Sequence, residues 1–480
     1  MLTLDAERRK IVQALENKQE KFWKISDVIW SYAELGLEEY KSAKLLADTL
    51  ESAGFKLERG VAGMPTAFVA SWSYGTGKPV IGFLAEYDAL PMLSQIAGST
   101  TQEPVVPGAP GHGCGHNTMG AMQALTVIAM REIMQKNGLN GTLKYFGSPA
   151  EEMLVSRPYM IRAGLFKDVE VVIDCHAWDF FKVAQGMEGA GMYSFIVTFK
   201  GKTAHSGGAP WKGRSATDGV ELMHAGTERM REHLPVTQRT HWVTLEGGEA
   251  PNVVPDKAST WYFIRDLDEN LGSHFNWVMD CAKGAALMTQ TTYEVKVLTG
   301  VHQRFNNKNL ATLIFNNMQT VGRPEYTEEE EVFARALQKN AGFPIKGLEY
   351  PIELSSPETT PFRASSSDVG DVTLISPTAT VRFPARIPGC HSHHWAVTSS
   401  VATSFAHKGI TAGAKVAAFT AYDLLTKPTL LAEIRTEFEE LSKKRPYKTF
   451  LPDDAEPPLG WNTGLMETYR SKMEEFYIDP

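Results

Sequence analysis

The residues whose types and spacing could do chemistry begin with Cys114 and His116, in the stretch from Gly111 to Asn117. A thiolate and an imidazole on so glycine-rich a turn can both point at one metal ion. Two ligands do not complete a site, so others must come from elsewhere in the chain. Taken alone, the stretch is more often a tight turn that binds nothing.

Carboxylates and further histidines occur in three other places. They are Glu151-Glu152, His176, and the cluster of His391, His393 and His394. Adjacent glutamates can divide the work of hydrolysis, one on a metal and the other free to take a proton from water. Each residue alone also fits a solvated acid or a buried histidine, and chemistry does not choose among the clustered histidines. Together they suit a borderline-soft divalent ion.

The elements that must position these residues are short apolar runs bounded by turn residues. We expect buried strands at residues 79–85, 141–147 and 169–174. Asp88 follows the first, Glu151 comes soon after the second, and His176 follows the third. In an open α/β sheet, chemistry gathers outside the carboxyl ends of the strands. The shared position is a stronger argument than any single residue.

The pattern changes near Gly186. From there the chain predicts strand, helix, strand, strand, helix, strand, which is the ferredoxin-like order. We therefore expect a catalytic domain in two segments, 1–187 and 302–480, around an inserted domain, 188–301. In the second segment, residues 325–361 are expected to form a surface excursion and residues 399–425 a long helix.

Composition narrows the class of protein. A length of 480 residues favours two domains, and a formal net charge of -8 argues against a nucleic-acid surface. No apolar run approaches the roughly 20 residues of a membrane helix, and the N-terminus is charged from the start. Four cysteines in so long a chain do not make a disulfide framework, so we expect a cytoplasmic protein.

The chain is similar to peptidase family M20 of metal-dependent amidohydrolases, in its aminoacylase/carboxypeptidase branch. The similarity spans nearly the whole length, in matching order, at residues 34–39, 86–91, 111–117, 149–152, 200–206, 251–255, 367–372 and 406–409. It implies an α/β fold, with a mixed-sheet, zinc-peptidase-like catalytic domain and an inserted ferredoxin-like domain that serves as lid and dimer contact.

The resemblance also implies a pair of divalent ions, commonly manganese or zinc. Their ligands would be Cys114 between the two ions, His116 and Glu152 on one, and His176 and His393 on the other. His393 is preferred because it stands two residues before Trp395, as in the family. His391 and His394 stay as alternatives.

Other roles follow from the same resemblance. Glu151 would be the general base, activating a metal-bridging water that attacks an amide carbonyl, and Asp88 would orient a ligand. His205 would reach a partner subunit's site and stabilise the oxyanion, although it also fits a capping residue. Asn252 and Arg265 would hold the substrate's carboxylate, although Arg265 also fits a surface ion pair.

The implied activity is cleavage of an N-acyl amino acid, particularly an aroyl one such as p-aminobenzoyl-glutamate. Another N-acyl amino acid or a dipeptide would need the same chemistry. A different hypothesis is a non-catalytic partner subunit of a heteromeric hydrolase. The partner would be an identical chain or a paralogous subunit, and neither nucleic acid nor membrane is expected.

Overall fold

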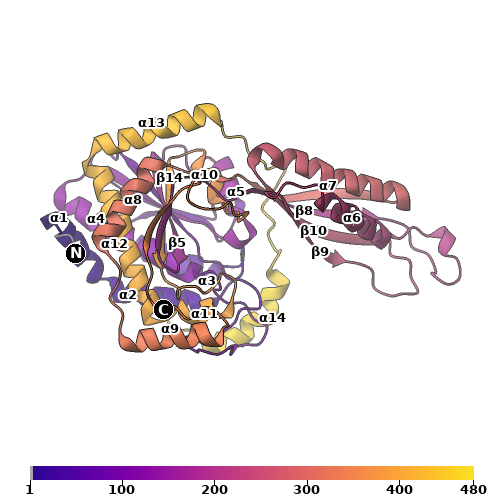
Figure 1. Ribbon diagram of the computed structural model, residues 1–480, viewed down its shortest axis with the longest axis horizontal. Helices are drawn as coiled ribbons and strands as arrows, with labels where there is room; N and C mark the ends of the chain where they lie inside the picture. The colour runs from indigo at the N-terminus through magenta and orange to yellow at the C-terminus, as the bar shows by residue number, and fades with distance from the viewer. Residues whose placement is uncertain (1–3) are drawn as a thin grey trace.

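The structure is a computed structural model that describes residues 4–480. The first three residues of the expected segment 1–187 lie outside this range. Figure 1 shows a broad main body and a narrower arm that extends to one side, built from residues 191–301. Within the described range, no helix is both long and apolar enough to cross a membrane.

The main body is built on a mixed sheet of eight strands. In spatial order they are β1 (Lys56–Arg59), β2 (Phe68–Tyr74), β4 (Gly141–Gly147), β3 (Val80–Ala85), β5 (Val171–Trp178), β14 (Thr378–Pro384), β6 (Phe181–Ala184) and β13 (Ile352–Ser355). β3 is parallel to β4 and β5, and β14 is parallel to β5. The carboxyl ends of these four strands therefore meet at one edge.

Helices cover both faces of this sheet, because alternate residues of a strand point to opposite sides. In β3, Ile81 and Phe83 join one apolar cluster, whereas Val80 and Leu84 join another. The first cluster is covered by α1 (Ala6–Glu16), α2 (Gln19–Tyr32), α3 (Tyr40–Ser52), α4 (His116–Asn137), α8 (Lys308–Val321), α12 (Ser404–Thr426) and α13 (Pro428–Lys444). The second is covered by α5 (Ser156–Arg162) and α10 (Val369–Thr373).

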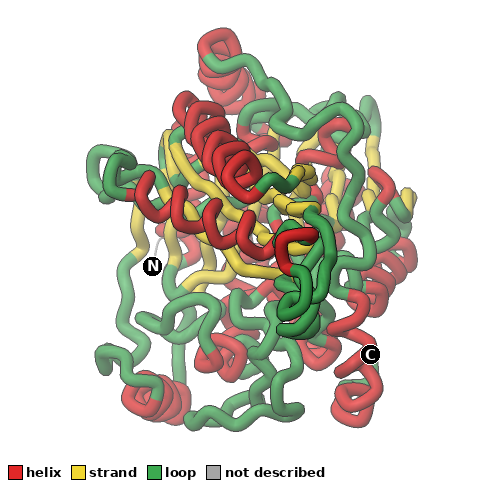
Figure 2. Tube along the Cα trace, turned by 90° about the vertical axis from the view of Figure 1, so that its right-hand side faces the viewer, coloured by secondary structure: helices red, strands yellow, loops and turns green. Residues whose placement is uncertain are grey.

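The arm, which we call the lid, has its own sheet and its own core. Its elements are β8 (Gly191–Lys200), α6 (Ala216–Arg231), β9 (Arg239–Glu246), β10 (Lys257–Asp266), α7 (Asp268–Thr289) and β11 (Thr292–Val301). The strand order β11-β8-β10-β9 is antiparallel throughout. Figure 2, which faces the lid, shows its two helices side by side over the strands. The expected α/β fold with a ferredoxin-like insertion is confirmed.

The chain enters and leaves the lid through one narrow ribbon. β7 (Gly186–Glu188) pairs antiparallel with β12 (Arg304–Asn306), and Glu188 faces Arg304 across the pair. The segment that precedes α14 (Thr463–Met473) also touches the lid, since the rings of Trp461 and Trp261 lie 4.8 Å apart. Both contacts tie the lid to the body.

The expectation of a surface excursion at 325–361 was wrong. This segment contains α9 (Glu328–Asn340), which begins with a capping box between Thr327 and Glu330, and the edge strand β13. Acidic side chains in a first helical turn interact favourably with the helix dipole, and Glu330 also pairs with Lys408 at 2.7 Å. The long helix expected at 399–425 is observed as α12, which begins at Ser404, shortly after the short helix α11 (Trp395–Ser400).

Candidate metal centre

The glycine turn brings Cys114 and His116 to the carboxyl edge of the large sheet. Gly115 precedes α4 and has a φ of 83°, in the left-handed region that favours glycine. A Cβ atom at Gly115 would lie 2.8 Å from Cβ of Ala177 in β5. Only glycine therefore lets the start of α4 approach β5 closely enough to place Cys114 beside His176.

The four other expected ligands lie around the Cys114 thiol. Cys114, His116 and His176 form one group whose potential ligand atoms are within 4.8 Å of one another, and Cys114, Glu152 and His393 form a second. Sγ of Cys114 is 3.7 Å from Nε2 of His176, and Nε2 of His393 is 3.2 Å from Oε2 of Glu152. The thiol is thus common to both groups. The pairing differs from the expected one, which joined His116 to Glu152 and His176 to His393.

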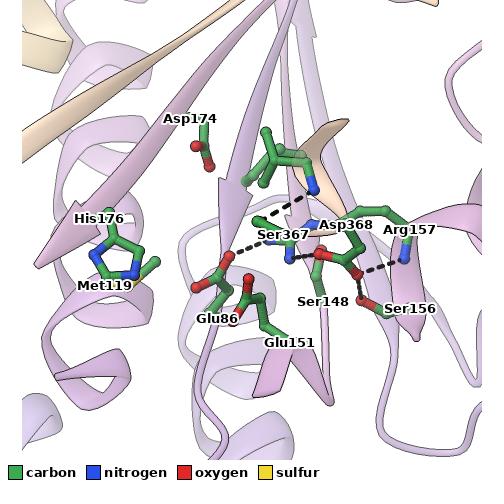
Figure 3. A network of polar contacts seen from close by, with 12 residues as sticks. Glu86, Met119, Ser148, Glu151, Ser156, Arg157, Asp174, His176, Ser367 and Asp368 are labelled. Carbon is green, nitrogen blue, oxygen red and sulfur yellow. Dashed lines mark hydrogen bonds and ion pairs between the residues drawn. The ribbon is translucent and has the colours of Figure 1, made fainter. Parts of the chain in front are cut away.

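A third group places Glu86 and Glu151 beside His116. Oε2 of Glu86 is 3.3 Å from Nε2 of His116, and Oε2 of Glu151 is 4.0 Å from the same atom. Arg157 pairs with Glu86 at 2.8 Å and also with Asp368, as Figure 3 shows. All five side chains are buried. In this network, the guanidinium of Arg157 supplies one fixed positive charge next to several buried carboxylates.

The pKa values of these groups follow from burial and from their neighbours. Burial alone would raise the pKa of the Cys114 thiol, but the imidazoles of His176 and His116 hold it well below its usual range. Burial raises the pKa of Glu151 well above its ordinary value, and the Glu86 carboxylate raises it further. Hydrogen bonds with Cys114 and Glu152 raise the pKa of His393 to about 10. The electrostatic environment of the cluster therefore favours the binding of a cation.

Several buried atoms of the cluster have no hydrogen-bond partner among residues 4–480. They are Oε2 of Glu86, Nε2 of His116 and Oε1 of Glu152. Buried polar atoms normally find partners, so a set of lone pairs facing one another needs an explanation. Thiolate, imidazole and carboxylate ligands suit zinc and other borderline-soft divalent ions. A metal would satisfy these atoms, and the residues fit one.

Asp88 holds two of these groups in place at once. Its Oδ1 is 2.9 Å from Nδ1 of His116, and its Oδ2 accepts a hydrogen bond of 2.9 Å from the backbone N–H of Glu152. Buried Glu39 accepts a second backbone bond in the same loop, 2.8 Å from the N–H of Ala150. Outer carboxylates of this kind fix the tautomer and direction of metal-binding histidines.

The backbone around the cluster is strained at three non-glycine residues. Ala150 and Leu154 flank Glu151 and Glu152 with φ values of 54° and 56°, and His393 itself has a φ of 63°. Left-handed backbone at such residues is costly and persists where surrounding contacts fix it, often at functional sites. For His393 one such contact is its own N–H, which donates to the carbonyl oxygen of Gly113 at 2.8 Å.

A cavity of about 810 Å³ opens onto the cluster, large enough for a small-molecule substrate. Cys114, Glu151 and His393 line it, and Arg265 reaches it from β10 of the lid. Nε of Arg265 has no hydrogen-bond partner among the described residues, and burial lowers the pKa of this guanidinium. His205 and Asn252 are exposed on the lid and are not among the described residues that line the cavity.

The sequence pattern of Peptidase family M20/M25/M40 matches residues 82–394, which include the whole cluster. The chain belongs to this family. One M20 relative is a subunit of p-aminobenzoyl-glutamate hydrolase from Escherichia coli K12, which is 34% identical over 483 residues, covering 94% of this chain and 98% of the relative. The expected resemblance is confirmed.

Two more distant proteins are also similar over most of the chain. Xaa-Arg dipeptidase of Mus musculus is 26% identical over 461 residues, covering 91% of this chain and 93% of the relative. The crystal structure of Bacillus subtilis YXEP protein, a dinuclear metal binding peptidase from the M20 family, is similar with a TM-score of 0.56 and 16% identity. That comparison covers 85% of this chain and 99% of the other.

Sequence reasoning missed the charged network beneath the cluster. Glu86 directly follows the strand that also precedes Asp88, and this position at a strand end could have indicated a residue of the site. Arg157 lies in a short helix, and its partners Glu86 and Asp368 are far away in the chain. Nothing in its local sequence indicates that it is fully buried.

Proposed function

We propose that this chain is a metal-dependent amidohydrolase that cleaves the amide bond of an N-acyl amino acid, with p-aminobenzoyl-glutamate as the leading candidate. The observation that carries the proposal is the arrangement around Cys114. Four potential ligands share the thiol in two groups, while Glu151 belongs to neither group and lines the same cavity. A site of this kind has ligands for two ions and a carboxylate left over for proton transfer.

Cys114, His116, Glu152, His176 and His393 would hold two divalent ions, manganese or zinc. When bound, such ions polarise a carbonyl oxygen and make water a better nucleophile at neutral pH. The two ligand groups and the buried atoms without hydrogen-bond partners among residues 4–480 support this assignment. Asp88 would keep His116 and the Glu152 loop in the geometry that the ions require.

Glu151 would act as the general base. It lies in the short helical turn η2 (Glu151–Met153) after β4, buried and beside Glu86. A carboxylate whose pKa is raised is a stronger base than an exposed glutamate, and it takes the proton of attacking water more readily. The same group would then return that proton to the departing amine.

Arg265 would hold the carboxylate of the substrate, because its guanidinium faces the cavity from the lid and its Nε has no hydrogen-bond partner among the described residues. We assign His205 and Asn252 to the site of a partner subunit, since both are exposed on the lid of their own chain. The domain at 188–301 would then serve as lid and dimer contact. The partner would be an identical chain or a paralogous subunit, as the name of the Escherichia coli relative suggests.

Replacement of Glu151 by Gln tests the mechanism. The variant should keep its metal, because the carboxamide has nearly the same shape, but should lose turnover by a factor of about 10² to 10⁴. Chelation should abolish hydrolysis by the wild-type protein, and manganese or zinc should restore it. Replacement of the exposed Glu358 by Gln is the matched control. Full activity in Glu151→Gln would show that the assigned mechanism is wrong.

Two other functions stay in view. The same chemistry on another N-acyl amino acid or a dipeptide would appear in a hydrolysis screen with the metal-loaded protein. A non-catalytic partner subunit would bind little metal when purified alone, so metal content per chain separates it from the enzyme. All four cysteines in the described range are free thiols, which suits the reducing cytoplasm that we propose as the location.

A further inference from the structure

The cavity beside the metal cluster is lined by more cationic than anionic side chains outside the cluster itself. Five cationic residues line it, namely Lys182, Arg265, Arg304, Arg363 and Arg382, and outside the metal cluster the only carboxylate among its described lining residues is Glu188. Lys182 is paired with Glu353 at 2.7 Å. Of the other cations, Arg304 lies on β12 of the lid ribbon and Arg382 on β14 of the large sheet, whereas Arg265 lies on β10.

Arg382 is the best-defined member of this group. It lies on β14 in register with His176 on the neighbouring parallel strand β5, so both side chains point to the same face. Its Nη2 donates to Glu188 at 2.7 Å, and its Cζ lies 5.3 Å from the ring centroid of Trp178. The guanidinium is therefore fixed next to a potential metal ligand.

One nitrogen of this guanidinium has no partner. Nη1 of Arg382 is buried and makes no hydrogen bond within residues 4–480, although the residue is only 6% exposed. Arg304 stands close by, since it faces Glu188 across the ribbon and reaches Thr380 at 3.1 Å. Arg304 also lies 3.9 Å from the buried carboxylate of Asp174, so the unsatisfied donor belongs to Arg382, and a buried guanidinium nitrogen without an acceptor is costly.

The carboxylate of Glu188 already interacts with these two arginines. Burial would raise the pKa of Glu188, but Arg382 and Arg304 lower it to about 2. Glu188 thus stays ionised at neutral pH and holds one side of the Arg382 fork, leaving the other side for a second acceptor. Arginine forks suit carboxylates because two donors can bind two oxygens.

We propose that Arg382, with Arg304 beside it, binds a second carboxylate of the substrate, so that this site selects N-acyl amino acids with two carboxylates over those with one. The inference rests on the proposed function and deepens it. Arg265 on the lid would hold one carboxylate and Arg382 on the sheet the other. The same charge would disfavour a dipeptide that ends in arginine.

The second carboxylate has two possible sources, and substrate pairs distinguish them. The amino acid supplies it in N-(4-aminobenzoyl)-glutamate, for which the glutamine analogue is the neutral isostere. The acyl group supplies it in N-(4-carboxybenzoyl)-alanine, for which the 4-carbamoylbenzoyl compound is the neutral isostere. We expect the wild-type, metal-loaded protein to favour the charged member of one pair, in kcat/KM, by roughly tenfold to a hundredfold.

The variant Arg382→Gln should reduce that ratio towards one. Because both members of a pair are measured on the same preparation, a partly unfolded variant changes both rates and leaves the ratio intact. The double variant Glu188→Gln/Arg382→Gln also removes the carboxylate that loses its Arg382 partner in the single variant, and it should give the same low ratio. Arg363→Gln, which removes an exposed cavity cation, is the matched control and should preserve most of the preference.

Binding gives a second readout that does not depend on turnover. In the Glu151→Gln background, the dissociation constant measured by calorimetry should show the same preference for the charged compound, and Arg382→Gln should remove it. A ratio near one for both pairs in the wild type would overturn the inference and leave the proposed function standing. An unchanged ratio in Arg382→Gln, or an equal loss in Arg363→Gln, would also overturn it. Failure to bind or cleave any N-acyl amino acid would refute the proposed function and the inference together.

Discussion

The replacement of Asp88 by Asn tests whether this buried carboxylate tunes the metal centre. Asp88 is 1% exposed and accepts from two donors, Nδ1–H of His116 and the backbone N–H of Glu152, both at 2.9 Å. Asparagine has nearly the same shape but offers only one acceptor oxygen. Its amide nitrogen must then face one of the two donors, so one buried contact changes from attraction to conflict.

The magnitude follows from the lost hydrogen bond. A buried donor without an acceptor costs about 1–3 kcal/mol, and each 1.4 kcal/mol corresponds to about tenfold in an equilibrium constant. If the conflict falls on His116 or on the loop of Glu152, metal affinity should decrease about 10- to 100-fold. The outer partners of metal-binding histidines typically contribute this much.

Metal affinity can be measured by competition with a chromophoric chelator, with kcat and KM determined at saturating manganese. We expect Asp88→Asn to bind metal more weakly and to recover part of its activity as manganese is raised. Asp168→Asn is the control, because Asp168 is exposed and, among residues 4–480, pairs only with Lys144. Wild-type metal affinity in Asp88→Asn would show that the two contacts do not support the centre.

Three further predictions concern stability. The pKa of His302 is raised, because its contact with Asp268 at 2.9 Å outweighs burial. The contribution of protonated His302 to the stability of the fold is therefore complete below about pH 6.5 and is lost as pH rises through the raised pKa. His302→Gln should thus cost more unfolding free energy at about pH 5.5 than at about pH 9 by urea titration, and an equal cost would contradict the assignment. Gly409→Ala should destabilise by about 1–3 kcal/mol, since a Cβ there would lie 1.8 Å from a backbone carbonyl oxygen at the end of β14, whereas Gly284→Ala, with open space around it, should be neutral or stabilising. Manganese at about 100 times its dissociation constant should add about 2.7 kcal/mol of stability, and a thermal shift as large in Cys114→Ser would exclude the thiol as a ligand.

The sequence predicted the catalytic edge because the edge is built from local signals. An apolar run followed by a carboxylate identifies a strand end, as at Asp88, and glycines beside Cys114 identify a turn. The order of elements in the lid was readable for the same reason, since each has its own periodicity. The prediction for residues 325–361 was wrong because a run of glutamates is as typical of the first turn of a helix as of a solvated loop.

What the sequence could not predict depends on pairs that are distant in the chain. The pairing of His393 with Glu152 depends on how a loop before α11 folds over the sheet. Arg382 belongs to none of the motifs that carry the family resemblance, and its role becomes visible only when β14 is placed beside β5 in register with His176. Charge networks of this kind are properties of the packed sheet.

The ribbon of β7 and β12 has a consequence for how such an enzyme can be dissected. Because Glu188 and Arg304 face each other across an antiparallel pair, the two ends of the insertion are about one strand spacing apart, roughly 5 Å. A two-residue hairpin turn could join them and excise residues 189–303 without stretching the remaining chain. The resulting miniature would retain the whole metal cluster and Arg382 while losing Arg265 and His205, so one deletion separates ion binding from the contributions of the arm.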